Sequence, residues 1–112
     1  MKVKMDVIWH KEAKEALRET AAYIRKNFGL IVREDFRNEV NHVQTLLQSN
    51  PYMGAIEPLL SDCPKEYRSF VINKLNKIVY YVEDDIIHIA DFWDTRRGPN
   101  QQAQQTKDDP NL

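Results

Sequence analysis

An acidic residue and two arginines lie close together where the last apolar segment of the chain ends. Asp94, Arg96 and Arg97 follow the segment "IIHIADFW". Guanidinium groups bind phosphate and carboxylate groups through paired hydrogen bonds, so this cluster could hold an anion. The alternative is an internal ion pair, in which Asp91 or Asp94 binds an arginine and fixes the end of the segment. The sequence leaves both interpretations open.

Arg68 is a further candidate for an anion site, although it lies far from these arginines in the sequence. It follows Tyr67 at the start of another apolar segment. Neighbouring strands bring distant residues to one edge of a sheet, and such positions often carry binding groups. The alternative is an ordinary solvated strand residue, and the sequence does not separate the two.

Three residues of the last two apolar segments are candidates for contact with a partner. Tyr81, His88 and Phe92 fall on one predicted face, where aromatic rings can stack on bases. A histidine can also act as a general base near neutral pH, although it more often fills a half-exposed strand position. Tyr80 and Trp93 continue the apolar alternation, so we expect both in the core.

The sequence indicates neither a metal site nor a cofactor site. His10, His42 and His88 are widely separated, and with the single cysteine they give no zinc-ligand spacing. The segment "NPYMG" lacks the glycines and the lysine of a nucleotide-binding loop.

Composition places the chain among small globular proteins of one domain. It has 112 residues, of which 42% are hydrophobic and 29% are charged. The lone Cys63 excludes an internal disulfide and suits a reducing compartment. No apolar run approaches the roughly 20 residues of a membrane span, and the start lacks the apolar core of a signal peptide, so we expect a cytoplasmic protein. The net charge is −1, so any anion-binding surface must be local.

Two helices are predicted after a short strand over Val3 to Trp9. From Lys11, apolar residues recur every three or four positions, and this helix should end at Asn27 to Gly29, where glycine supplies the cap. A second helix should end before Asn50 and Pro51. Its apolar stripe consists of Val32, Phe36, Val40, Val43 and Leu47. The short link makes the pair an antiparallel hairpin, and the Lys, Arg and Glu side chains between the apolar positions are expected to form a solvated face.

Three strands are predicted after a loop that contains three prolines. The loop, "NPYMGAIEPLLSDCPKE", has room for one short extended piece near Ile56 to Leu60. The apolar period then becomes two, which predicts strands over residues 66–72, 76–82 and 86–94. Asp84 and Asp85 can form the tight turn between the last two strands.

That turn predicts the register of the last two strands. If Val82 faces Ile87, then Tyr80 faces Ile89 and Ile78 faces Asp91. These positions give a core face of Ile78, Tyr80, Val82, Ile87 and Ile89. The opposite face is mixed, so we expect it to be partly wet or covered by a partner. It carries Lys77, Val79, Tyr81, His88, Ala90 and Phe92.

The element order is strand, helix, helix and then three strands (β-α-α-β-β-β). This order predicts the α+β class, with an N-terminal strand and a helical hairpin packed on one face of an antiparallel β-sheet. Residues 1–99 form the predicted domain. Residues 100–112, "NQQAQQTKDDPNL", are polar and rich in glutamine, so we expect a disordered tail there.

This order and several segments together resemble the RelE/ParE superfamily of bacterial toxins. The segments are "WHKEAKEALRETAAYI", "NPYMG", "YRSFVI", "NKIVYYV" and "IHIADFWDTRRGP", and the resemblance covers residues 3 to 99. It rests on order and spacing rather than on one specific motif. It implies a toxin of a type II toxin-antitoxin system, which arrests growth and is neutralised by a cognate antitoxin. Some members cleave messenger RNA on the ribosome, and others inhibit DNA gyrase.

The resemblance also implies which residues could act. In ribonuclease members, basic residues of the central strands and of the end of the last strand hold the scissile phosphate, and Arg68, Lys77 and Arg96 or Arg97 match those positions. The tyrosine or histidine that such members carry after the last strand is absent here. Whether the chain is an enzyme therefore stays open, and gyrase inhibition is the less contradicted activity. The alternative from another class is a non-catalytic interaction module of the same fold that has lost toxicity.

Overall fold

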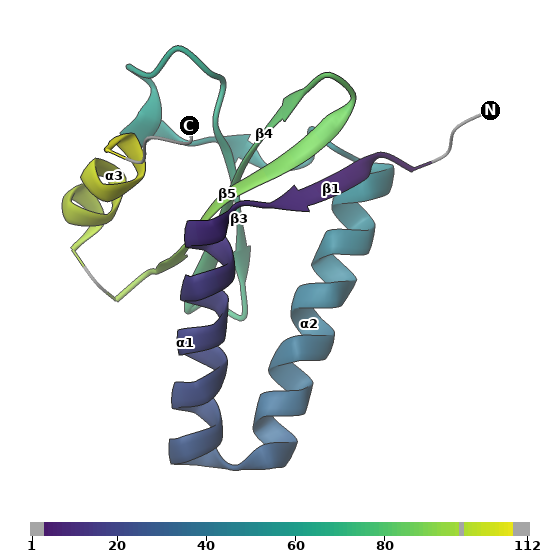
Figure 1. The fold of residues 1–112 in the computed structure, drawn as a ribbon, viewed down its shortest axis with the longest axis vertical. Helices are drawn as coiled ribbons and strands as arrows, with labels where there is room; N and C mark the ends of the chain where they lie inside the picture. The colour runs from purple at the N-terminus through teal and green to yellow at the C-terminus, as the bar shows by residue number, and fades with distance from the viewer. Residues whose placement is uncertain (1–3, 97, 109–112) are drawn as a thin grey trace.

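The computed structural model describes residues 4–96 and 98–108. Its five-stranded sheet has the order β1-β5-β4-β3-β2, in which β1 runs parallel to β5 and the other neighbours are antiparallel (Figure 1). The predicted α+β class is confirmed, as is the order of a strand, a helical hairpin and then strands up to β5, but the sheet is mixed rather than antiparallel throughout. The elements are β1 (Asp6–Trp9), α1 (Lys11–Phe28), α2 (Leu30–Ser49), β2 (Ala55–Ile56), the 3-10 helix η1 (Pro58–Leu60), β3 (Arg68–Ile72), β4 (Asn76–Glu83), β5 (Ile86–Asp94) and α3 (Pro99–Lys107).

The helical hairpin forms as predicted, around a single glycine. Gly29 separates α1 from α2, and its φ of 95° is one that residues with a Cβ rarely adopt. Its backbone N–H donates to the carbonyl of Arg25 at 3.0 Å, which completes the last turn of α1. The chain reverses within one residue, so α1 and α2 must lie antiparallel and close together.

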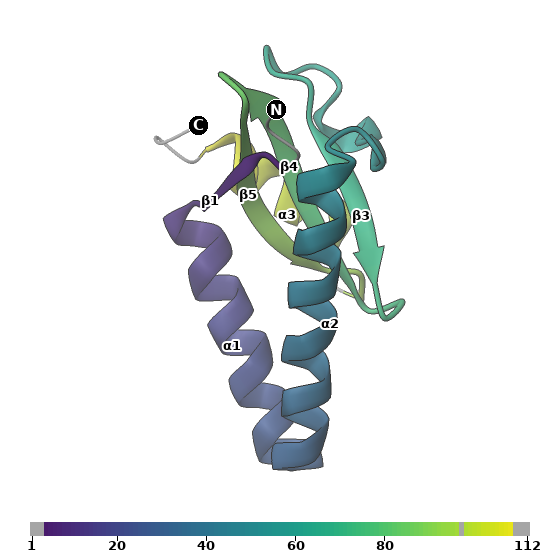
Figure 2. The same ribbon diagram turned by 90° about the vertical axis from the view of Figure 1, so that its right-hand side faces the viewer.

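The apolar stripe of the hairpin packs on the sheet, and the hairpin extends beyond it. The main core cluster joins Ala13 of α1 and four buried residues of α2 to β3, β4 and β5. Those four are Phe36, Val40, Val43 and Leu47. Val32 belongs to the predicted stripe but is 44% exposed, because the ends of both helices that meet at Gly29 project past the sheet (Figure 2). No helix among the described residues is long and apolar enough to cross a membrane.

The turn between β4 and β5 is tight, as predicted. Asp84 and Asp85 both have positive φ angles, 56° and 60°, as the two central residues of a type I′ hairpin turn do. Val82 pairs with Ile87, so the register begins as predicted.

The predicted register is wrong beyond Tyr80, because a bulge adds one residue to β5. Tyr80 pairs with Ile89 but Val79 pairs with Asp91, so Ile78 lies opposite Phe92 rather than Asp91. The extra residue reverses the faces of the following side chains. Phe92 therefore joins the core beneath the helices, and Trp93 joins the opposite face.

The C-terminal segment forms a helix, which corrects the prediction of a disordered tail over residues 100–112. Helix α3 covers Pro99–Lys107, and residues 109–112 lie outside the described part of the chain. The prediction failed because the buried polar side chains of α3 find partners. The amide of Gln102 accepts from the backbone N–H of Asp94 at 2.9 Å and donates to its carbonyl at 2.8 Å. The Thr106 hydroxyl donates to Asp91 and accepts from the Trp93 indole at 3.1 Å.

Helix α3 also explains what covers the second face of the sheet. A separate apolar cluster lies there, and α3 contributes Ala103 to it while η1 contributes Leu60. Figure 2 shows α3 on the side of the sheet away from α1 and α2. The other members are Tyr67, Val79, Tyr81, Ala90 and Trp93. The face that we expected to be wet or covered by a partner is therefore covered by the chain itself.

We predict that Thr106→Val will lower the free energy of unfolding by about 1–3 kcal/mol, because it leaves the Trp93 N–H buried without an acceptor. Urea denaturation of both proteins measures this change. The matched control is Thr45→Val, whose exposed hydroxyl donates within its own helix to Asn41, and its effect should stay within about 0.5 kcal/mol. Equal effects of the two substitutions would show that the Thr106 bonds do not hold α3.

Candidate functional site

Arg68 lies on the face of the sheet beneath the helices, and its two terminal nitrogens are engaged in local structure. It pairs with Tyr80, a member of the main core cluster. Its guanidinium donates to the carbonyls of Gly54 at 2.8 Å and Tyr52 at 3.3 Å, and to Glu66 at 2.9 Å. These bonds tie the loop before β2 to the start of β3.

Lys77 lies on the opposite face, in an ion pair with a buried acid. It pairs with Trp93 across the β4–β5 ladder, and its Nζ lies 5.5 Å from the centroid of the Trp93 ring. The same Nζ lies 2.7 Å from Oε1 of Glu57, whose side chain is 1% exposed. Burial alone would raise the pKa of Glu57, but hydrogen bonds from Lys77 and the Leu59 N–H, with the charge of Lys77, outweigh it and hold the pKa below 4.5.

Arg96 forms the internal ion pair that was the alternative to an anion clamp. Its Nε and Nη2 donate to the two carboxylate oxygens of Asp94 at 3.1 and 3.2 Å, and this pairing raises the pKa of Arg96. Asp94 pairs with Asn76 of β4, which also pairs with Ile72 at the end of β3. Arg68 is at the other end of β3, so Asp94 and Arg68 lie at opposite ends of the sheet. Arg97 lies outside the described residues. The prediction that Arg68 and Lys77 gather with the arginines in one site is wrong, since strand alternation places Arg68 and Lys77 on opposite faces.

The three residues predicted to contact a partner are mostly covered. Tyr81 is 5% exposed and stacks on His88, with ring centroids 4.7 Å apart. Phe92 is 4% exposed and packs against Trp9 and Phe36. Because of the bulge in β5, Phe92 lies in the core rather than on the predicted face. As placed, Tyr81 and Phe92 offer little surface to a partner.

His10 and His88 are adjacent, although they are distant in the sequence. Nε2 of His10 lies 3.1 Å from Nδ1 of His88 because β1 pairs with β5 in parallel. His88 is thus a partner of another histidine as well as of the Tyr81 ring. Within residues 4–96 and 98–108, no group of three or more His, Cys, Asp or Glu side chains is arranged to hold a metal ion.

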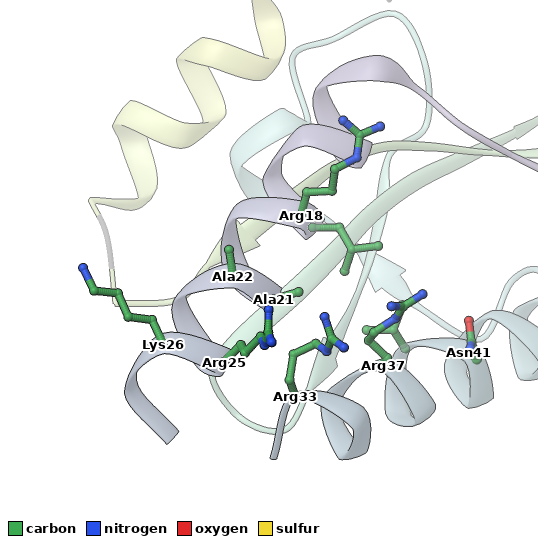
Figure 3. Close-up of a pocket in the computed structure, with 10 residues that line it drawn as sticks. Arg18, Ala21, Ala22, Arg25, Lys26, Arg33, Arg37 and Asn41 are labelled. Atoms are coloured by element: carbon green, nitrogen blue, oxygen red, sulfur yellow. The ribbon is translucent and has the colours of Figure 1, made fainter. Parts of the chain in front are cut away.

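The structure places an open groove between α1 and α2. Its volume is about 760 Å³, its floor includes Leu17, Ala21 and Val40, and Asn41 lines one side. Figure 3 shows the groove bordered by arginines from both helices, with Lys26 directed away from it. We call it the arginine groove, after Arg18 and Arg25 of α1 and Arg33 and Arg37 of α2.

The spacing of the arginines explains why they meet at one groove. Arg18 and Arg25 are seven residues apart in α1, and Arg33 and Arg37 are four apart in α2, so each pair lies along one side of its helix. The antiparallel hairpin then brings the two sides together. Among the described residues, Arg33 binds the neighbouring Glu34, and the other three side chains have no hydrogen bond or ion pair.

This groove was not predicted from the sequence, where the charged positions of both helices are expected to form one solvated face. Acids and bases are in fact separated on α1. Glu12, Glu15 and Glu19 line shallow pockets on the side toward β5 and α3, whereas Arg18 and Arg25 border the arginine groove. A net charge of −1 therefore coexists with a locally basic surface. The signal in the sequence was the seven- and four-residue spacing of the arginines.

We predict that Lys77→Met will destabilise the protein by about 3 kcal/mol, because it leaves the buried Glu57 carboxylate without its charged partner. Thermal or urea unfolding measures the loss. Lys65→Met is the matched control, since Lys65 pairs with the more exposed Glu83, and it should change stability little. A small effect of both substitutions would contradict the structural assignment of the Lys77–Glu57 pair.

A second prediction concerns pH. Because the folded pKa of Glu57 is below 4.5, the carboxylate stabilises the fold above that pH, and this contribution is lost as the pH falls through the folded pKa. Glu57→Gln lacks the contribution at every pH. The stability difference between wild type and Glu57→Gln should therefore be largest near neutral pH and shrink in acid, as measured by urea unfolding from pH 7 to pH 3. A constant difference would exclude this linkage.

Comparison with known proteins agrees with the resemblance noted in the sequence. A family profile described as "ParE toxin of type II toxin-antitoxin system, parDE" matches residues 7–99. A solved structure titled "Chromosomal ParDE TA system from P. aeruginosa" superposes with a TM-score of 0.67 at 17% identity, over 83% of this chain and 98% of that chain. A comparison with curated proteins finds no match. The fold thus agrees with a ParE structure, and the matched residues span most of the chain. The chain belongs to the ParE toxin family of type II toxin-antitoxin systems.

Proposed function

We propose that this toxin is neutralised by an antitoxin that lays an amphipathic, acid-bearing helix in the arginine groove. The observation that carries the proposal is the groove itself. It combines an apolar floor, including Leu17 and Val40, with arginines on both walls. An apolar groove between helices is a common seat for an amphipathic helix, and unpaired cations at its edges favour a helix with flanking carboxylates.

The composition of the groove favours a protein segment over a nucleic acid. Phosphate backbones need cations but gain little from an apolar floor, and sequence-tolerant single-strand binding relies on exposed aromatic rings. Among the residues that the structure describes, no aromatic side chain lines the arginine groove. The chain also carries no net positive charge that would attract nucleic acid at long range.

For the target, we propose DNA gyrase rather than messenger RNA on the ribosome. Three of the four cations proposed for a ribonuclease site are held in ion pairs, Arg68 with Glu66, Lys77 with Glu57 and Arg96 with Asp94. Phosphoryl transfer needs cations directed at the developing charge. The sequence also lacks a tyrosine or histidine after β5. Both features support an inhibitor that acts by binding, and the match to the ParE family supports gyrase.

The test induces the chain alone in a bacterial host and then with the protein encoded by the adjacent reading frame. We predict growth arrest with the first and rescue with the second. Purified toxin should inhibit supercoiling by gyrase, and transcripts isolated after induction should show no new ends at ribosomal A-site codons. Absence of arrest would favour the non-toxic interaction module, and A-site cleavage would favour the ribonuclease.

A double charge reversal tests whether the antitoxin binds in the arginine groove. Arg18→Glu with Arg37→Glu should raise the amount of antitoxin needed for rescue, because the groove would then repel the acidic helix. Lys11→Glu with Lys74→Glu is the control, since both lysines are exposed and lie outside the groove. Growth arrest by each variant in the absence of antitoxin is measured in the same strains, and it serves as the reference for rescue. Equal rescue of both double variants would place the antitoxin elsewhere.

A further inference from the structure

Arg33 differs from the other arginines of the groove in its burial and bonding. Its side chain is 24% exposed, and its Nε is buried without a hydrogen-bond partner among the described residues. Its one bond runs from Nη2 to the carboxylate of the adjacent Glu34, at 2.9 Å. The side chain of Glu34 is 53% exposed, so this bond competes with water.

A buried arginine N–H that lacks a hydrogen-bond acceptor does not by itself indicate a ligand, as Arg68 shows. The Nε of Arg68 is also buried without a partner. However, the other nitrogens of Arg68 bond to two backbone carbonyls and to Glu66, and its guanidinium lies over the Tyr52 ring. Arg68 therefore has a complete structural role. Arg33 has no such set of bonds, and it lines an open groove instead.

Positive charge also gathers around Arg33 in the free protein. It lies in the first turns of α2, near the positive end of the helix dipole. That helix has no acidic residue in its first turn and no side-chain cap. The unpaired Arg25 and Arg37 line the same groove. A carboxylate bound here by Arg33 would be attracted by all of these positive charges.

We propose that Arg33 is the anchor of the groove, that is, the residue that binds one specific carboxylate on the partner helix. The carboxylate accepts from two N–H groups of the guanidinium in a two-bond geometry, which a lysine or a glutamine at this position cannot reproduce. The apolar floor next to it, Ala21 and Val40, takes an apolar side chain from the neighbouring turn of that helix. This inference rests on the proposed function and adds that a single acidic residue decides recognition.

The first test uses acetate as the carboxylate probe on the intact protein. The Nε–H resonance of Arg33 is assigned by its loss in Arg33→Gln and followed by NMR during titration with sodium acetate, against sodium chloride at equal ionic strength. We expect a saturable shift at Arg33 at least about threefold larger than at Arg37, which serves as the matched control. Equal or unsaturable shifts at both arginines would overturn the proposal.

The second test titrates the product of the adjacent reading frame against toxin variants in cells. Arg33→Gln should need about tenfold more antitoxin for rescue than wild type, and Arg37→Gln about twofold more. If Arg33→Gln and wild type need the same amount of antitoxin for rescue, Arg33 is not the anchor, while the proposed function stays intact. Failure of the product to rescue wild type overturns the proposed function, and the acetate titration then decides on Arg33 independently of toxicity.

Discussion

Burial of the helical hairpin against the central strands is the interaction on which the rest of the structure depends. Phe36, Val40, Val43 and Leu47 of α2 meet Ile78, Tyr80, Ile87 and Ile89 of β4 and β5 in one continuous cluster. Side chains of this size contribute about 1.5–3 kcal/mol each when buried, so this contact dominates the stability of a small domain. It also fixes the rotation of both helices about their axes. Once the apolar stripes face the sheet, the four arginines necessarily lie on the outward-facing side, at the groove between α1 and α2.

The elements could be predicted from the sequence because each depends on local pattern. Helical periodicity, Gly29 and the Asp84–Asp85 turn act over a few residues, and the structure agrees with all three. The bulge at Val79 and Tyr80 could not be predicted, because nothing in the alternation of β5 distinguishes Ala90 or Asp91 as an extra residue. One inserted residue exchanged the faces of Phe92 and Trp93. Helix α3 was missed for a different reason, since its stability comes from the partners of Gln102 and Thr106 rather than from an apolar stripe of its own.

The candidate site was harder to predict than the fold, because residue type alone does not show whether a cation is paired. Arg68, Lys77 and Arg96 had suitable types and lay on suitable strands, yet each has an acid within ion-pair distance. In contrast, the helical arginines lie among many glutamates in the sequence, and only the hairpin geometry separates them. Ion pairing depends on three-dimensional proximity, whereas periodicity is present in the sequence itself. For this reason the helical hairpin and the central strands could be predicted from the sequence, while the distribution of free positive charge could not.

The arginine groove stays open because of small residues on α1. Ala21 and Ala22 line it where α1 faces α2, and the larger apolar residues that line it, Leu17 and Val40, leave the space between the helices open. A leucine at such a position would bury additional area and draw the helices together, so stability alone would favour a larger residue there. The chain instead keeps two alanines at the floor and long cations on the walls. Positive charges that face one another across the groove also repel, which opposes closure. Small floor residues and arginines that mostly have no ion pair thus act together to hold open a surface that the core itself does not need.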